Sequence, residues 1–211
     1  MKHRFVTSCA VLLLMSLLAF GSLAYFTASD RVINRFSVAG SGSDVEPDRL
    51  FSLRLYETDG NSQTEVGLHY RDIVPGQTVK KDPTVENTGR YDQWIRVYLT
   101  VTNAANWEDC CNANGIDFLD IFRGLNRQTW TVVGSPTRNY QEDTLTYVFY
   151  LKHKLAPGET MALFDAVTIP REFGVEEMVA LSSFQMILCS DAIQADHTGD
   201  SAQEAFEAYW N

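Results

Sequence analysis

The chain has 211 residues, of which 17 are lysine or arginine and 27 are aspartate or glutamate, so its net charge at neutral pH is −10. Because all-β domains of this length commonly form one core, the length predicts a single domain, and a hydrophobic fraction of 45% argues against wholesale disorder. An acidic surface repels phosphate backbones and anionic lipid headgroups, which disfavours nucleic-acid binding and nonspecific membrane adhesion.

The N-terminus has the pattern of a secretory signal peptide. Two basic residues, Lys2 and Arg4, precede an apolar run from Cys9 to Phe20, and small residues continue through Ala24. A run of about a dozen apolar residues is shorter than the roughly 20 that a bilayer-spanning helix needs. Residues 1–24 are therefore predicted to be a cleaved leader, with a retained membrane anchor as the alternative.

Cleavage is predicted between Ala24 and Tyr25. Ser22 and Ala24 place small side chains where a signal peptidase has its two shallow pockets. Cleavage would leave 15 basic and 27 acidic residues, a net charge of −12. We expect a mature protein that is secreted to the extracellular matrix or the cell surface, without stable membrane insertion after processing.

The first segment of the mature chain is predicted to be an extended strand. Residues 25–40 carry spread apolar side chains without a helical stripe, and residues 41–49 are rich in Gly, Ser, Pro and acidic residues, which indicates a flexible linker. An extended segment on such a tether can complete its own sheet or the sheet of a neighbouring copy. The proposed assembly strand comprises Val32, Ile33, Asn34, Phe36 and Val38.

Alternation of apolar and polar residues dominates residues 50–200 and predicts a β-sandwich domain. Gln93–Thr102 places four aliphatic residues on one face, which is the pattern of a half-buried strand. Thr144–Lys152 alternates in the same way and carries β-branched and aromatic residues that suit a pleated surface. Further strands are predicted at Leu50–Tyr56, Gln77–Val85, Thr129–Val133, Met161–Ile169 and Val179–Cys189.

Two similar turns and two short helices complete the predicted fold. The motifs PGQT at 75–78 and PGET at 157–160 predict type II turns, because proline presets φ at the second turn position and glycine accepts a positive φ at the third. Ile116–Leu125 can form about two helical turns, and residues 201–211 are predicted to be a C-terminal helix because they open with capping-box spacing. Together these elements predict an all-β, antiparallel β-sandwich of jelly-roll or immunoglobulin-like type.

The cysteines leave two interpretations open. Removal of the leader takes Cys9 and leaves Cys110, Cys111 and Cys189, an odd number for an exported protein. In one interpretation Cys189 forms a disulfide with one of the vicinal pair, and the remaining thiol pairs with another molecule or binds metal. In the other, the thiols are buried or reduced and have no role.

No motif of an established catalytic or metal site is present in the sequence. The mature histidines, His69, His153 and His197, are far apart, and the chain lacks a zinc-peptidase helix motif, a GxSxG elbow, a glycine-rich phosphate loop and EF-hand spacing. The acidic pairs at 108–109 and 176–177 are interpreted as solvated surface carboxylates. We therefore assign no catalytic residue, no metal and no cofactor, and expect a protein that is not an enzyme.

Aromatic residues within the predicted strands allow a second functional class. On an outer sheet face they could form an adhesive or carbohydrate-binding strip, whereas inside the sandwich they would pack the core. Core and cross-strand packing is the simpler interpretation, and the adhesive module stays as an alternative. The residues concerned are Trp94, Tyr98, Trp130, Tyr147, Phe149 and Tyr150.

Three stretches of the chain resemble one family of exported bacterial proteins. The first, AYFTASDRVINRFSVAG, follows the leader directly, and the second is IVPGQTVKKDPTVENTGRYDQWIRVYLTV. The third comprises YVFYLKHKLAPGETMALF, SSFQMILCSDAIQAD and a terminal acidic helix ending in AFEAYW. In this order they cover most of the chain and resemble TasA, camelysin and other proteins exported through the dedicated signal peptidase SipW.

The resemblance implies a jelly-roll-like sandwich, processing by a SipW-type signal peptidase and a role in the biofilm matrix or surface fibres of a Gram-positive bacterium. Self-association, or association with related matrix proteins, would follow, and strand addition after leader cleavage is the mechanism we expect. The vicinal cysteines and an insertion at 107–124 depart from the family pattern. A metallopeptidase activity is attributed to the family through camelysin. The sequence supplies neither the ligands nor the general base of such an activity, so it is not carried over to this chain and stays only as a rival hypothesis.

Overall fold

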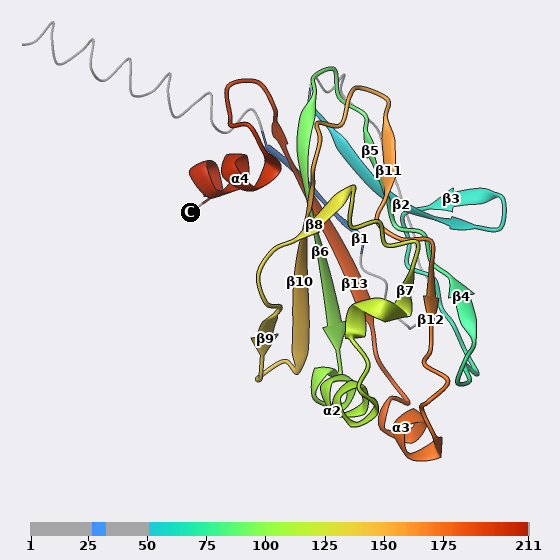
Figure 1. Cartoon of the computed structure of the whole chain (residues 1–211). Helices are drawn as coiled ribbons and strands as arrows, with labels where there is room; N and C mark the ends of the chain where they lie inside the picture. Colours follow the sequence, from blue (N-terminus) through green and yellow to red (C-terminus); the bar gives the residue numbers. More distant parts are fainter. Residues whose placement is uncertain (1–26, 33–50, 211) are drawn as a thin grey trace, which may run out of the picture.

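The structure is a computed structural model that describes residues 27–32 and 51–210 (Figure 1). The predicted leader, its cleavage position between Ala24 and Tyr25, and the linker at 41–49 lie outside these residues. No helix in the described part is long and apolar enough to cross a membrane.

An antiparallel sheet of six strands forms the centre of the molecule. Its strands lie in the order β1-β13-β6-β10-β8, and β9 pairs with the first part of β10. The longest pairing joins β13 to β6 over nine residues, from Met186 opposite Val101 to Gln194 opposite Gln93. The bounds are β1 Thr27–Val32, β6 Gln93–Thr102, β8 Trp130–Val132, β9 Thr137–Asn139, β10 Thr144–Leu151 and β13 Met186–Gln194.

Two smaller antiparallel sheets cover the inner face of this large sheet. One has the order β11-β5-β2-β3 and the other β4-β12-β7, and Figure 1 shows both on the same side of β6 and β10. The bounds are β2 Leu53–Asp59, β3 Ser62–Thr64, β4 Thr78–Lys80, β5 Thr84–Asn87, β7 Phe122–Arg123, β11 Thr160–Ala162 and β12 Ala166–Thr168. The predicted all-β antiparallel sandwich is therefore confirmed.

The core lies between these layers, and its composition follows from strand alternation. In β6, Ile95, Val97, Leu99 and Val101 are fully buried in one hydrophobic cluster with side chains of β2, β5 and β12. Successive strand residues point to opposite faces, so the same strand sends Trp94 and its alternate neighbours to the outer face. The inward face predicted for Gln93–Thr102 is confirmed.

Three short helices are present in the described part, and a 3-10 turn accompanies them. Helices α2 (Ala104–Asn114) and α3 (Val175–Ala180) lie together at one end of the sandwich, next to the 3-10 helix η1 (Phe118–Ile121) (Figure 1). The C-terminal helix α4 (Ala202–Trp210) lies away from them, against the outer face of the large sheet.

The helix predicted at Ile116–Leu125 is wrong. Only Phe118–Ile121 forms a 3-10 turn there, and the chain then enters β7, while the true helix α2 precedes this segment. Gly115, at a φ of +65°, ends α2 in the left-handed conformation that glycine adopts without strain. The buried residues of α2, Ala104, Trp107, Cys110 and Cys111, do have helical spacing, but alanine and cysteine are a weak apolar signal among the polar residues of this segment.

Three predicted strand ranges are divided or shortened in the structure. Pro83 stands between β4 and β5 where one strand was expected over Gln77–Val85, and proline cannot donate a hydrogen bond to a sheet. The strand expected over Val179–Cys189 begins only at Met186, because α3 occupies the start of that range. Likewise, the range Met161–Ile169 forms the two short strands β11 and β12.

The C-terminal helix is confirmed, and it covers part of the outer face. Glu204 donates its backbone N–H to the Ser201 hydroxyl at 3.3 Å, while its carboxylate accepts from the backbone of Asp200 at 3.1 Å. These contacts provide the local start that the capping-box spacing predicted. Phe206 of α4 is buried against Trp94, Tyr150 and Ile193 in a second hydrophobic cluster.

The two predicted proline-glycine turns have the expected geometry. Gly76 and Gly158 adopt φ values of +77° and +76°, and each turn closes with a hydrogen bond to the carbonyl three residues earlier, from Gln77 to Val74 at 3.1 Å and from Glu159 to Ala156 at 2.9 Å. Both turns feed a short strand, β4 and β11 respectively.

Replacing Gly158 tests the turn. An added Cβ would meet no atom within 4 Å, so the effect of Gly158→Ala should come from backbone strain alone, about 1–2 kcal/mol of unfolding free energy. Gly158→Asn is the matched control, because asparagine tolerates the left-handed region better, and it should cost clearly less. Urea denaturation would measure both, and equal losses would contradict the strain argument.

Candidate assembly edge

Strand β1 forms one edge of the large sheet, and among the described residues it pairs only with β13. All six residues are in antiparallel register with β13, from Thr27 opposite Ile193 to Val32 opposite Leu188. Since β13 also pairs with β6, removal of β1 would leave a nine-residue strand with one row of unpaired backbone groups. Such an edge accepts another strand of compatible register.

The predicted assembly residues are only partly placed. Val32 ends β1, opposite Leu188, whereas Ile33, Asn34, Phe36 and Val38 lie outside the described residues. The paired strand begins at Thr27 and therefore closer to the expected cleavage position than the proposed residues indicated. Only two residues, Tyr25 and Phe26, separate that position from the first paired residue.

The β13 strand is anchored on both of its faces. On the inner face Met186, Leu188 and Ala192 are buried in the core. On the outer face the Asp191 carboxylate accepts a hydrogen bond from the Arg96 guanidinium at 2.8 Å. The same guanidinium lies 4.2 Å from the ring centroid of Phe206, a cation–π contact that ties the sheet to α4. Contacts with β6, the core and Arg96 therefore hold the acceptor strand β13 in addition to its pairing with β1.

A buried ion pair lies in the facing layer, between β2 and the chain after β4. The Lys81 ammonium is 2.6 Å from the Glu57 carboxylate, and the side chains are 3% and 1% exposed. Burial lowers the pKa of Lys81, because the ammonium loses its water, and the Glu57 carboxylate opposes that shift. Glu57 occupies an inward position in phase with Leu53 and Leu55, so its burial could have been inferred from the alternation of β2.

Tyr70 belongs to the same neighbourhood. Its hydroxyl donates to the Lys80 carbonyl, and burial together with the negative charges of Glu57, Asp82 and Asp59 raises its pKa. The hydrogen bond of Tyr70 fastens the loop at 69–72 to the end of β4.

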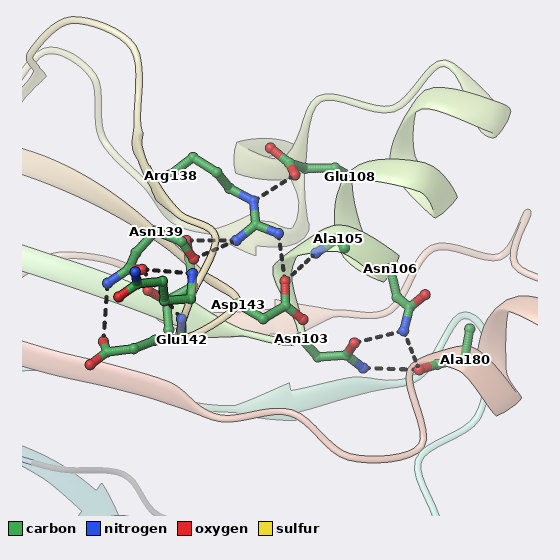
Figure 2. A network of polar contacts seen from close by, with 11 residues as sticks. Asn103, Ala105, Asn106, Glu108, Arg138, Asn139, Glu142, Asp143 and Ala180 are labelled. Atoms are coloured by element: carbon green, nitrogen blue, oxygen red, sulfur yellow. Dashed lines mark hydrogen bonds and ion pairs between the residues drawn. The ribbon is translucent and has the colours of Figure 1, made fainter.

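Arg138 joins the β9–β10 hairpin to α2 (Figure 2). Its guanidinium contacts the carboxylates of Glu108 at 3.0 Å and Asp143 at 2.5 Å, and the Asp143 carboxylate also accepts from the backbone of Ala105 at 3.0 Å. That backbone bond and Arg138 both lower the pKa of Asp143. The arrangement supplies an acceptor to the first turn of α2, and its ion pairs are structural contacts at the surface.

Asn103 and Asn106 continue this network toward α3 (Figure 2). Both side-chain amides donate to the carbonyl of Ala180, at 2.9 and 3.2 Å. Asn103 has a φ of +58°, in the left-handed region that asparagine tolerates. Helix α2, which contains the start of the segment at 107–124, is therefore fastened to α3 through Asn106 and to the β9–β10 hairpin through Glu108.

The cysteines do not form the proposed bridge. Cys110 and Cys111 are free thiols buried in α2, so neither is joined to Cys189, which lies in β13 on the outer face of the sheet. Burial raises the pKa of both thiols, that of Cys111 to about 11. The acidic setting also opposes ionisation of Cys110, because Glu177 and Asp109 lie nearby.

The histidines and acidic pairs do not converge. His69, His153 and His197 lie in three different loops, and no group of three His, Cys, Asp or Glu residues in the described part could hold a metal ion. Glu108 binds Arg138, and Glu177 accepts from the backbone of Gly174 at 2.9 Å, so each of these has a structural contact.

The aromatic residues pack the interior. Trp94, Trp130, Tyr147, Phe149 and Tyr150 are all buried, and the indole of Trp130 donates to the Ala162 carbonyl at 2.9 Å. Tyr98 alone of the six is only half-buried. The packing interpretation is confirmed, and an exposed tryptophan strip at Trp94 and Trp130 is ruled out for the adhesive alternative.

Comparisons with protein-family models, with curated proteins and with solved structures returned no match. The resemblance to TasA and camelysin therefore stays an expectation from the three sequence stretches.

The ion pair between Lys81 and Glu57 can be tested by a double-mutant comparison. Lys81→Met should lower the unfolding free energy by about 3–5 kcal/mol, because it leaves a carboxylate buried without its cation. Combining it with Glu57→Leu removes that charge and should restore most of the loss. Urea denaturation would measure all three chains, and a double variant as unstable as the single one would show that lost packing, not charge, dominates.

The burial of Cys110 and Cys111 predicts the order in which the three cysteines react with an alkylating reagent. At pH 8 the folded chain should react with iodoacetamide at Cys189 first, because Cys110 and Cys111 are buried and have raised pKa values. In guanidinium chloride without reductant, all three mature cysteines should react. Mass spectrometry of peptides would read the order, and a pair that resists alkylation in the unfolded chain would indicate a disulfide instead.

Proposed function

We propose that this protein is a secreted structural component of an extracellular or biofilm matrix, and that it assembles into fibres by strand addition. In this mechanism β1 of one copy pairs with β13 of the next copy in place of the acceptor's own β1. The observation that carries the proposal is the edge position of β1, paired over six residues with a strand that is otherwise fixed in the core. The three sequence stretches similar to TasA and camelysin supply the matrix role.

Exchange of β1 between copies should cost little in backbone hydrogen bonding. A strand donated by a neighbour can form the same antiparallel hydrogen bonds that β1 forms within its own chain, so the number of bonds need not change. Eighteen residues, 33–50, connect β1 to the described sandwich, and a chain of that length can span at most roughly 60 Å. That reach is enough for β1 to serve an adjacent molecule.

Leader cleavage would act as the switch for assembly. The predicted cut leaves a new N-terminus two residues before β1, so an uncleaved leader would hold this end at the membrane. Processing by a SipW-type signal peptidase would release β1 for a partner outside the cell. The acidic mature chain, with a net charge of −12 after cleavage, would stay soluble until assembly.

One added cysteine, opposite the native Cys189, can show which chain supplies β1. Residue 31 lies directly opposite the native Cys189, and directly opposed residues of an antiparallel pair have Cα separations that suit a disulfide. In fibres of mature Arg31→Cys protein under mild oxidation, strand addition should produce a ladder of covalent oligomers on non-reducing gels. The ladder should collapse to monomer when reductant is added.

Two controls define the outcome. Ser29→Cys lies two residues out of register with Cys189 and should cross-link much less, and Arg31→Cys combined with Cys189→Ser should not form the ladder at all. Deleting residues 25–40 should leave a folded, soluble core that forms no fibres in electron microscopy. If Arg31→Cys fibres yield only internally bridged monomers, or if the deleted chain forms the same fibres, the strand-addition proposal is wrong.

A further inference from the structure

A hollow lies at the end of the large sheet where β13 begins. Its volume is about 450 Å³, and its wall is formed by the loop at 69–73, by residues of α2 and α3, and by residues 182–184, which lead into β13. We call it the β13 hollow. The apolar side chains in its wall are Ile73, Trp107, Ile169, Met178, Leu181 and Phe184.

The β13 hollow lies on the same side of the sandwich as β1. In the facing sheet β4-β12-β7, Phe122 of β7 packs on Phe118, whose ring stacks on Tyr147 of β10. Strand β7 therefore lies over β10, and β4, at the other edge of that sheet, lies toward β13 and β1. The loop at 69–73 leads into β4 and is fastened to its end by the hydrogen bond of Tyr70. The wall that this loop supplies is thus on the β1 side of the large sheet.

The register of β1 directs its continuation to the β13 hollow. Val32 lies opposite Leu188, and each further residue of an antiparallel partner meets one residue earlier in the other chain segment. Four residues beyond Val32, Phe36 would therefore lie opposite Phe184, in the wall of the hollow. Leu188 is buried in the core, and strand positions alternate between the two faces, so Val32 and Phe36 both take inward positions.

The length of the chain permits this path. After Phe36, fourteen residues, 37–50, lead to Phe51, and the next residue, Ser52, lies at the other end of the sandwich, where its carbonyl accepts from Gln93 at 2.9 Å. The ten residues of β6 span roughly 30 Å between the two ends, whereas fourteen residues reach up to roughly 50 Å. The return from the hollow to Phe51 is therefore within reach.

Aromatic side chains already gather at the β13 hollow. The ring centroid of Trp107 lies 5.0 Å from that of Phe184 and 6.0 Å from that of Phe173. Aromatic clusters favour edge-to-face and offset contacts, so a further ring suits this wall. Phe36 is the only aromatic residue between positions 33 and 50. Register, reach and chemistry therefore select the same side chain.

We propose that the strand paired with β13 continues beyond Val32 and seats the Phe36 ring in the β13 hollow. The ring would add a side-chain anchor to the six residues of β1 that pair through their backbone. The contact is the same whether β1 comes from its own chain or from a neighbouring copy. The inference therefore goes beyond the proposed function and does not depend on it.

Disulfide trapping in the mature chain tests the seat. In the continued register Ser37 lies opposite Ser183, so Ser37→Cys with Ser183→Cys, in a Cys189→Ser background, brings two thiols to a separation that suits a disulfide. In a glutathione redox buffer, the effective concentration of these thiols should be at least about tenfold higher than that of the matched pair Ser41→Cys with Ser183→Cys. Mass spectrometry of peptides would identify each bridge.

Two substitutions separate the ring from the strand that carries it. Phe36→Ala should lower the effective concentration of the 37–183 pair by about tenfold, because the ring no longer holds the segment in the hollow. Ile33→Ala is the matched control, because position 33 falls on the outward face, and it should change that concentration less than about twofold. Arg31→Cys with the native Cys189 should still form its bridge in both backgrounds, which shows that β1 stays paired.

Three results would overturn the seat. The first is a 37–183 pair that oxidises no more readily than the 41–183 pair, which would mean that the hollow has another occupant, such as a second copy or a small apolar ligand. The second is an unchanged 37–183 pair in Phe36→Ala, and the third is an equal loss in Ile33→Ala. Strand addition is judged separately: a 37–183 bridge within monomers supports the seat even if fibres contain no bridges between copies, whereas a 31–189 ladder without the 37–183 bridge overturns the seat alone.

Discussion

The rest of the fold depends on strand β6. Nine of its residues pair with β13 along one edge and seven pair with β10 along the other, and its inward side chains fill the core. Alternation makes this possible, since every second residue faces the interior and the remaining residues are free to meet other elements. On the outer face of β6, Trp94 and Arg96 contact Phe206 of α4. The same strand therefore also positions the C-terminal helix. Both long pairings depend on β6 keeping one register, because a one-residue slip would move its aliphatic row to the outside.

The edge of the large sheet is a candidate assembly site because β13 is held by contacts other than its pairing with β1. The core and the bond between Arg96 and Asp191 hold β13, so the backbone groups that β1 covers are presented in a constant geometry. An edge strand of this kind is a liability in an ordinary soluble domain. In the proposed strand addition, the row of β13 backbone groups that β1 covers would be the means of joining copies.

The two ends of the sandwich differ because different connections meet there. At one end α2, α3 and the β9–β10 hairpin are fastened together by Arg138, Asn103 and Asn106, which leaves the valines of α3 at the surface. At the other end the turns before β6 and after β10 meet through Gln93 and Leu155 and carry lysines. Exposed valines therefore lie at the α3 end of the large sheet.

The sequence by itself determined the class of fold, the long strands and the C-terminal helix. Period-two alternation in Gln93–Thr102, proline-glycine turns at 75–78 and 157–160, and the capping spacing at Ser201 are local signals, and each has the conformation that its chemistry dictates.

Tertiary structure decided the rest. Helix α2 has only a weak apolar stripe, and Asp143 and Gly115 supply contacts at its two ends. The carboxylate of Glu57 is tolerated inside the sandwich because Lys81 comes from another segment to pair with it. The pairing of β1 with β13 depends on contacts between residues more than 150 positions apart, which no local pattern encodes.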